Sequence, residues 1–308
     1  MSVSEVKDEK LVNDILKLKE ERKAIILAHN YQIGEVQDIA EFVGDSLGLS
    51  QQAAKTEAEV ILFCGVHFMA ETAKILSPEK TVLMPDVNAG CAMADMITLR
   101  QLKEMKKRHP EAVVVCYVNT TAEIKAESDY CCTSANAVKV VQAIPKEKEI
   151  IFIPDKYLGD YASKQANRKM ILWEGYCPTH RRILAEDILK KKALYPKAEV
   201  LVHPECTPDV IAMADKVLST SGICKYAKES SSGEFIIGTE IGILHRLKKE
   251  NPDKKFYPAS SLADCHSMKL NNLEKLLWSL EDMIYKVEVP GDIAQRAKRS
   301  IDRMLEIV

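Results

Sequence analysis

The stretch AIILAHNY at residues 24–31 is a short apolar run that ends in polar residues. Two later stretches repeat this pattern, VVVCYVNT at 113–120 and EVLVHPEC at 199–206. The leading side chains at the ends of these runs lie 88 and then 86 positions apart. Self-similarity over a fixed long period indicates one structural unit used three times. The residues that end the three runs are His29, Tyr31, Tyr117, Asn119, His203 and Glu205.

Two further kinds of residue keep the same period. A hydroxyl follows each leading residue by 17 positions, at Ser46, Ser134 and Thr220. A cysteine follows each leading residue by 60 to 62 positions, at Cys91, Cys177 and Cys265. We therefore expect three homologous units whose equivalent residues meet around a pseudo-threefold axis, with the active site at the centre.

Apolar runs rich in Ile, Val and Leu alternate along the chain with amphipathic segments of helical length. This pattern predicts an α/β protein made of three-layer αβα domains, each with a short parallel sheet. The expected domains are 1–95, 96–180 and 181–308, the last including the C-terminal helices. Ligands bind beyond the carboxyl ends of strands in such sheets, so the polar strand ends are the expected site.

Composition excludes several classes of function. Charged residues make up 29% of the 308 residues and the net charge is only -2, so no long-range field favours nucleic acid or an anionic membrane. The first residues, MSVSEVKDEKLVNDILKLKEERK, are charged and amphipathic, which is typical of neither a signal peptide nor a transmembrane segment. We expect a cytoplasmic protein without nucleic-acid or membrane partners.

Nine cysteines in a reducing compartment do not predict a disulfide framework. Three soft ligands converging on an axis favour a 4Fe-4S cluster whose fourth iron stays open to substrate, where it acts as a Lewis acid. Zinc is an alternative, because CPTH at 177–180 contains one Cys-x-x-His pair. A further alternative is that all three cysteines are buried as small hydrophobes, the commoner fate of a free thiol.

The three hydroxyls, Ser46, Ser134 and Thr220, fall where helices are predicted to begin. Together with free backbone N–H groups they could hold a phosphate or carboxylate, although each could also be no more than an N-cap. Histidine, glutamate and tyrosine at the neighbouring strand ends are candidates for proton transfer. His180 and His266 lie close in sequence to two of the cysteines.

A family resemblance rests on motifs distributed over the whole chain. They are AHNYQ, GDSL, MPDVNAGCAMAD, YVNTTAEIKA, CCTSANA, WEGYCPTH, HPEC, STSG, FIIGTEIG and SLADCHSMKLNNL. Through them the sequence resembles the quinolinate synthases, 4Fe-4S enzymes of de novo NAD synthesis. The resemblance implies three similar α/β domains about a pseudo-threefold axis. It also implies condensation of iminoaspartate with dihydroxyacetone phosphate to quinolinate, with loss of phosphate and two waters.

The resemblance carries over to individual positions. It implies that the cluster ligands are Cys91, Cys177 and Cys265. It implies that the substrate site contains His29, Tyr31, Ser46, Tyr117, Asn119, Ser134, His203, Glu205 and Thr220. From their chemistry we expect Glu205 and Tyr31 to transfer protons, Tyr117 and Asn119 to position the intermediate, and His203 and His29 to bind carboxylate or phosphate; Tyr117 and His203 are also catalytic candidates. A C-terminal CxxC-type pair found in some family members is absent here.

Two other functions use similar residues. An aconitase-like iron–sulfur hydro-lyase would also need an open iron, but would act on a small hydroxy acid. An iron–sulfur redox sensor is the second alternative, although electron-transfer clusters usually have four protein ligands and DNA-binding sensors a basic helix. For a quinolinate synthase, the reactivity of iminoaspartate in water favours hand-off from an aspartate-oxidising enzyme.

Overall fold

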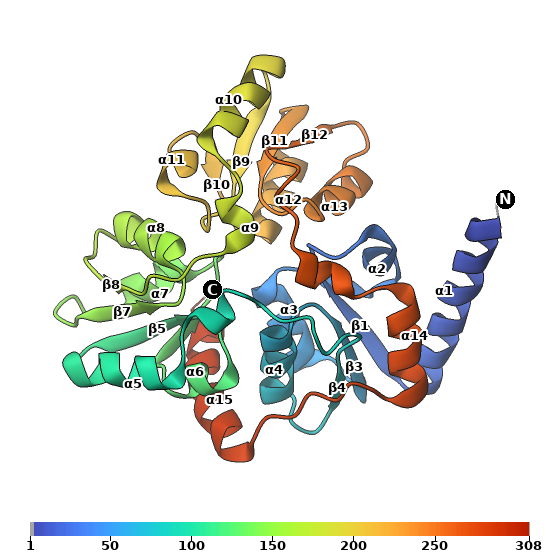
Figure 1. The fold of residues 1–308 in the computed structure, drawn as a ribbon, viewed down its shortest axis with the longest axis horizontal. Coiled ribbons are helices and arrows are strands. Elements are labelled where there is room, and N and C mark those ends of the chain that lie inside the picture. Colours follow the sequence, from blue (N-terminus) through green and yellow to red (C-terminus); the bar gives the residue numbers. More distant parts are fainter. Residues whose placement is uncertain (1–2, 308) are drawn as a thin grey trace. The chain divides into compact units, whose positions relative to one another are not determined.

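The protein contains three parallel four-stranded sheets, each flanked by helices, in a computed structural model that describes residues 3–307 (Figure 1). By its internal contacts the chain divides into two compact parts. The first part holds the residues up to Cys91 together with His266–Pro290, and contains the first sheet. The second part holds Ala92–Cys265 together with the chain from Gly291 onward, and contains the second and third sheets.

The first sheet has the strand order β2-β1-β3-β4. Its strands are β1 (Ala24–His29), β2 (Phe42–Gly44), β3 (Val60–Cys64) and β4 (Thr81–Leu83). The helices of this part are α1 (Val3–Glu21), α2 (Gly34–Ile39), α3 (Ser46–Lys55), α4 (His67–Leu76), the 3-10 turn η2 (His266–Leu270) and α14 (Leu273–Asp282). In the register, Ile25 pairs with Ile61 and Val60 with Thr81.

The second sheet repeats this order as β6-β5-β7-β8. Its strands are β5 (Val113–Tyr117), β6 (Tyr130–Cys132), β7 (Ile150–Ile153) and β8 (Ile171–Leu172). Its helices are η1 (Ala94–Met96), α5 (Leu99–Arg108), α6 (Ala122–Ala126), α7 (Ala137–Ala143), α8 (Lys156–Ala166) and α15 (Gly291–Glu306).

The third sheet has the same order again, β10-β9-β11-β12. Its strands are β9 (Glu199–Val202), β10 (Lys216–Val217), β11 (Glu234–Gly238) and β12 (Lys255–Pro258). Its helices are α9 (Pro178–Arg181), α10 (Ala185–Leu194), α11 (Pro208–Ile211), α12 (Thr220–Glu229) and α13 (Ile243–Glu250). Threefold repetition of one strand order confirms the predicted αβα units. Their placement about a common axis stays a prediction.

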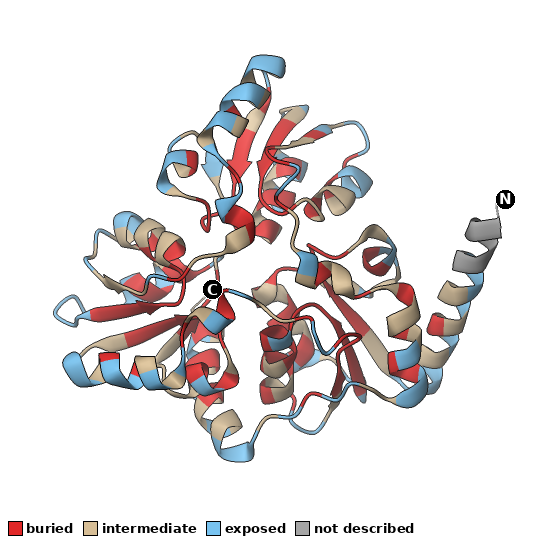
Figure 2. Ribbon diagram, in the orientation of Figure 1, coloured by how far each residue is buried: buried red, intermediate tan, exposed pale blue. Residues whose placement is uncertain are grey.

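Central strands are buried on both faces, which is why they read as unbroken apolar runs (Figure 2). In the first sheet, Ile26 and Leu62 point to one face and pack with Ile15 of α1 and Leu276 of α14. Leu27, the next residue after Ile26 in β1, points to the opposite face and is also fully buried. Helices pack on both faces of the sheet and bury the apolar side chains of its central strands.

The two C-terminal helices pack away from the third sheet, although the predicted third domain of 181–308 included them. The reason for α14 is an apolar stripe, Leu273, Leu276 and Leu280, which completes the core cluster of the first sheet. The helix α15 packs against α6 and β6 of the second sheet, where the Ser300 hydroxyl donates to the Lys125 carbonyl at 2.9 Å. The domain boundaries stay a prediction, but these helices belong to the cores of the first two sheets.

An ionic contact also holds α15. Arg296 donates from Nη1 to Glu127 Oε1 at 2.8 Å, and Lys106 and Lys103 lie close to the same carboxylate. Burial alone would raise the pKa of Glu127, but the hydrogen bond from Arg296 and the two lysine charges outweigh it and hold that pKa below its usual value. The carboxylate therefore contributes to the docking of α15 as long as it is ionised.

The strands β2, β6 and β10 were not predicted. They are edge strands of two or three residues each, too few for a periodic signal. Among residues 3–307, no helix is both long enough and apolar enough to cross a membrane.

Candidate active site

The second part of the chain brings together polar groups from the ends of two sheets. Tyr117 is the last residue of β5, and Glu205 lies three residues after the end of β9. The Tyr117 hydroxyl donates to Glu205 Oε1 at 2.5 Å, and both side chains are buried. Tyr117 and Glu205 lie 88 positions apart, at or just beyond the carboxyl ends of equivalent strands in the second and third sheets, and this hydrogen bond shows that these two strand ends meet.

His180 connects this carboxylate to a cysteine. Its Nδ1 lies 2.7 Å from Glu205 Oε2 and 3.1 Å from Cys177 Sγ, and its Nε2 lies 2.8 Å from Thr239 Oγ1. The ligand atoms of Cys177, His180 and Glu205 all lie within 4.8 Å of one another, so this group could hold a metal ion. The short helix α9, which begins directly after Cys177, brings His180 back over the sulfur.

His203 completes the cluster from the third sheet. Its ring stacks on that of His180 with centroids 4.7 Å apart, and its Nε2 lies 3.1 Å from Ser134 Oγ. The backbone N–H of Glu205 donates to His203 Nδ1 at 3.4 Å. The His203 ring therefore turns Nδ1 towards the backbone of Glu205 and Nε2 towards the Ser134 hydroxyl.

Electrostatics fix the charge of Glu205. Burial alone would raise the pKa of this carboxyl, but the charges of His180 and His203 and the hydrogen bonds from His180 and Tyr117 lower it well below its usual value. Asp155 shows the opposite shift, because burial and the nearby negative charge of Glu205 raise its pKa well above the usual value. Glu205 is therefore an ionised proton acceptor at neutral pH, and it is enclosed by donors.

Asn119 offers unused hydrogen-bonding capacity. Its Oδ1 is buried and has no hydrogen-bond partner among the described residues. A buried acceptor without a donor costs about 1–3 kcal/mol, so such atoms mark places where a ligand or water completes the structure. This observation supports the predicted substrate contact.

The three predicted hydroxyls lie near helix starts but are not the helix caps. Ser46 and Thr220 are the first residues of α3 and α12, whose N-caps are Asp45 and Ser219. The alternative that Ser46 and Thr220 are N-caps is therefore wrong. Ser134 precedes α7 by three residues and contacts His203 instead.

Within the first part of the chain, His29 and Tyr31 repeat the local geometry of His203 and Glu205. The backbone N–H of Tyr31 donates to His29 Nδ1 at 3.2 Å, and the two rings meet edge to face at 4.5 Å. Lys269 donates to the Tyr31 carbonyl. In both repeats, the backbone N–H two residues after the histidine donates to the histidine Nδ1. The histidine Nε2 is therefore the ring nitrogen that can contact other groups.

The nine cysteines, all free, divide into two classes by exposure. Six are buried, whereas the three that share the sequence period, Cys91, Cys177 and Cys265, are partly exposed. The alternative that these three are buried hydrophobes therefore does not hold. Accessible soft thiols in equivalent loops are the donor set that an iron–sulfur cluster requires.

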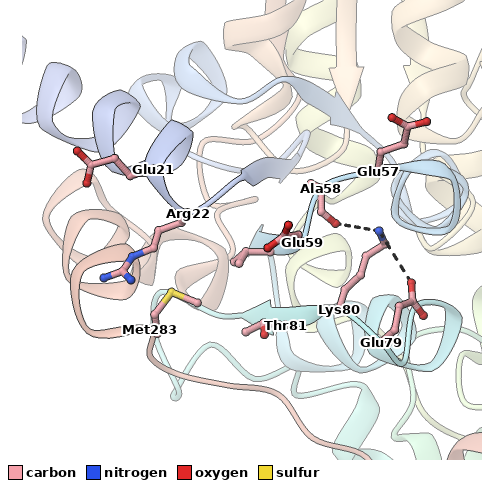
Figure 3. A pocket seen from close by; sticks show the side chains of 10 residues that line it. Glu21, Arg22, Glu57, Ala58, Glu59, Glu79, Lys80, Thr81 and Met283 are labelled. Carbon is pink, nitrogen blue, oxygen red and sulfur yellow. Dashed lines mark hydrogen bonds and ion pairs between the residues drawn. The ribbon is translucent and has the colours of Figure 1, made fainter.

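A separate pocket of about 540 Å³ lies at the opposite, amino-terminal ends of the first sheet's strands (Figure 3). Glutamates dominate its wall, and Lys80 donates from Nζ to the Ala58 carbonyl at 2.8 Å. Arg22 is engaged with the carbonyls of Leu280 and Glu281. Because ligands in parallel α/β sheets bind at the carboxyl ends, this pocket is not the catalytic site.

Three residues at the strand ends were not predicted as site residues. Thr239 contacts His180, Glu240 accepts a hydrogen bond from Cys265, and Asp155 lies close enough to Glu205 for their charges to interact. All three follow β7 or β11 by one or two residues. The rule that selected His203 and Glu205, polar residues directly after a strand, would have found them.

Comparisons with known proteins agree on one family. A family model described as "Quinolinate synthetase A protein" matches residues 13–306. A quinolinate synthase of Dehalococcoides mccartyi (strain CBDB1) is 58% identical over 300 residues, which cover 97% of this chain and 99% of that protein. A quinolinate synthase of Methanosarcina barkeri is 55% identical over 297 residues, covering 96% and 97%. One of Geobacter metallireducens is 55% identical over 294 residues, covering 96% of each chain.

Proposed function

This chain belongs to the quinolinate synthase family, enzymes of NAD biosynthesis, and we propose that it condenses iminoaspartate with dihydroxyacetone phosphate. The products are quinolinate, phosphate and two waters, which balances the atoms of the two substrates. The observation that carries the proposal is the buried group of Tyr117, Glu205 and His180 against the thiol of Cys177. It places an ionised proton acceptor beside a potential metal ligand.

The cofactor we propose is a 4Fe-4S cluster held by Cys91, Cys177 and Cys265. Their shared exposure, in contrast to six buried cysteines, supports this donor set. When bound, the cluster supplies an iron without a protein ligand, which acts as a Lewis acid on a hydroxyl leaving group. His180 then serves as a hydrogen-bond donor to the Cys177 sulfur rather than as a fourth ligand.

Proton transfers are assigned to Glu205 and Tyr31, with Tyr117 and His203 next to the reacting atoms. Building an aromatic ring from an imine and a triose phosphate requires an isomerisation and two dehydrations, and each of these moves protons. Glu205 is ionised because its pKa is lowered, so its oxygens are available as proton acceptors, and Tyr117 can return a proton through its 2.5 Å hydrogen bond. Thr239, bonded to His180 Nε2, fixes the ring that faces the carboxylate.

Substrate binding is assigned to neutral donors and acceptors. Asn119, with its unpartnered Oδ1, positions the intermediate together with Tyr117. His29 and His203 bind carboxylate or phosphate through Nε2. The hydroxyls of Ser46, Ser134 and Thr220, with the backbone N–H groups of helix starts, hold the phosphate that is later released.

Iminoaspartate reacts readily with water, so we propose that an aspartate-oxidising enzyme supplies it directly. Nine free cysteines suit a reducing compartment, which supports a cytoplasmic location.

The test is quinolinate formation by anaerobically reconstituted protein supplied with iminoaspartate and dihydroxyacetone phosphate. We expect product from the unmodified chain and from Cys64→Ala, which removes a fully buried core thiol, but none from Cys91→Ser. If the unmodified protein carries a 4Fe-4S spectrum and yet makes no quinolinate, the assigned substrates are wrong. If Cys91→Ser is as active as Cys64→Ala, the assigned ligand set is wrong.

A further inference from the structure

The loops that carry the three repeated cysteines are fastened by the same backbone hydrogen bond. In each unit, the residue three positions after the end of the second central strand donates its N–H to the carbonyl two residues before the cysteine. The three bonds, at 2.8, 2.9 and 2.9 Å, run from His67 to Ala89, from Lys156 to Gly175 and from Ile241 to Ala263. The sequence period is therefore matched by a repeated attachment of the cysteine loops.

The residue before each donor differs between the units. It is Val66 in the first, Asp155 in the second and Glu240 in the third. Glu240 is fully buried and accepts the backbone N–H of Cys265 at Oε1, 3.1 Å away, and that of Gly242 at Oε2, 2.7 Å away. One carboxylate thus ties the cysteine to the loop that follows β11.

Asp155 is fully buried and occupies the equivalent place beside Cys177. Its Oδ1 caps α8 by accepting the N–H groups of Tyr157 and Leu158 at 2.8 and 3.0 Å. The other oxygen, Oδ2, is buried and has no hydrogen-bond partner among the described residues, although the backbone N–H of Cys177 is near enough to this carboxyl to affect its pKa. A small inward movement of the Cys177 loop would give the buried Oδ2 the donor that it requires.

Close approach of the backbones supports the same reading. A Cβ added to Gly175 would lie 2.4 Å from the carbonyl oxygen of Pro154, next to Asp155. No side chain fits between the cysteine loop and the end of β7, so glycine permits the contact. The Cys177 loop and the segment after β7 are therefore in close contact at Gly175.

We infer that Asp155 and Glu240 are positioning residues, whose carboxyl groups hold the backbone of Cys177 and of Cys265 in the geometry that receives the cluster. The inference rests on the proposed function, because it takes these cysteines as cluster ligands. In the first unit Val66 offers no carboxylate at the same place. A carboxyl group therefore positions two of the three cysteine loops, those of Cys177 and Cys265.

The test compares local amide exchange in Asp155→Asn and Glu240→Gln, measured by hydrogen–deuterium exchange on the full chain without cluster. Asn keeps an oxygen to cap α8, and Gln keeps one of the two acceptors of Glu240, so neither change removes the whole network. Loss of one hydrogen bond predicts exchange at the affected cysteine that is about tenfold faster. Asp155→Asn should affect the segment around Cys177 alone, and Glu240→Gln the segment around Cys265 alone.

Asp45→Asn is the matched control, because it makes the same substitution at a buried N-cap with the cap hydrogen bond to Gly48. It should leave exchange at both cysteine segments unchanged. In reconstituted protein, Asp155→Asn and Glu240→Gln should release iron to a chelator faster than the control does, as followed by the decay of the cluster absorbance.

Three results would overturn the inference: unchanged exchange at both cysteines, faster exchange over the whole chain, or iron release equal to that of Asp45→Asn. Since amide exchange is measured without cluster or substrate, its result is independent of quinolinate formation. Local loosening in a protein that makes no quinolinate would uphold the positioning role and reject the assigned reaction. The reverse combination would uphold the reaction and reject the positioning role.

Discussion

Replacing Glu205 with glutamine tests the centre of the proposed site. The substitution keeps the shape of the side chain but removes its negative charge and one of two acceptor oxygens, which contact Tyr117 at 2.5 Å and His180 at 2.7 Å. A general acid–base group contributes about 10²–10⁴-fold to a rate, so quinolinate turnover should fall by about that factor. Folding stability should also fall, by about 3–5 kcal/mol, because the lowered pKa of Glu205 shows that its partners more than offset the cost of burying its charge.

The assay follows quinolinate formation and the iron content of the same preparation. We expect the brown 4Fe-4S spectrum to remain while turnover is lost. Glu199→Gln is the control, because Glu199 also accepts a tyrosine hydroxyl, that of Tyr226 at 2.7 Å, and lies at the opposite end of β9. Near-normal turnover in Glu205→Gln would refute the proton-transfer role, as would an equal loss in the control.

Gly175→Ala should lower the melting temperature and speed iron loss, because its Cβ meets the Pro154 carbonyl oxygen at 2.4 Å and overpacking costs about 1–3 kcal/mol. Gly233→Ala, with nothing within 4 Å of the added Cβ, should do neither, and equal melting temperatures would count against the close approach. Glu127→Gln should lower the melting temperature at neutral pH but not in acid. The pKa of Glu127 is lower in the folded than in the unfolded protein, so its ionised form stabilises the fold above the unfolded pKa of roughly 4.5. This stabilisation is lost as the pH falls through the folded-state pKa. A melting-temperature difference that does not shrink between pH 7 and pH 3 would contradict this sign. Leu276→Ala should lower the free energy of unfolding by about 2–5 kcal/mol in denaturant titrations, because this side chain is fully buried in the core of the first sheet. A loss below about 1 kcal/mol would mean that α14 is not part of that core.

Much of the fold was predictable because its signals are local. A run such as VVVCY at 113–117 is β-branched and apolar throughout, and this composition reports burial on both faces of a parallel sheet. By contrast β10 is the dipeptide Lys216–Val217, which has no period of its own. It pairs with β9 only because the preceding segments bring it there.

The site was predictable where the repeat marks it and less so elsewhere. Periodicity selected Tyr117 and Glu205, and the structure joins them by a hydrogen bond. The contacts of Asp155 and Glu240 were not foreseen, because the approach of a carboxyl group to a cysteine more than 20 residues away depends on how two loops come together. Amphipathic helices likewise reveal an apolar face without naming the sheet that it covers, which is why α14 and α15 were expected in the third domain.

Return of the last helices to the first two sheets has a consequence for biosynthesis. A ribosome releases the first sheet's strands long before it makes Leu273–Asp282, the helix that covers one face of that sheet. The third sheet, in contrast, is made with its own helices in one continuous segment. Domains fold as their residues emerge, so the last sheet to be synthesised is the first that has all its parts, and the two earlier ones wait with apolar surface exposed. Chains that stall or terminate within the last forty residues would therefore be substrates for chaperones and proteases.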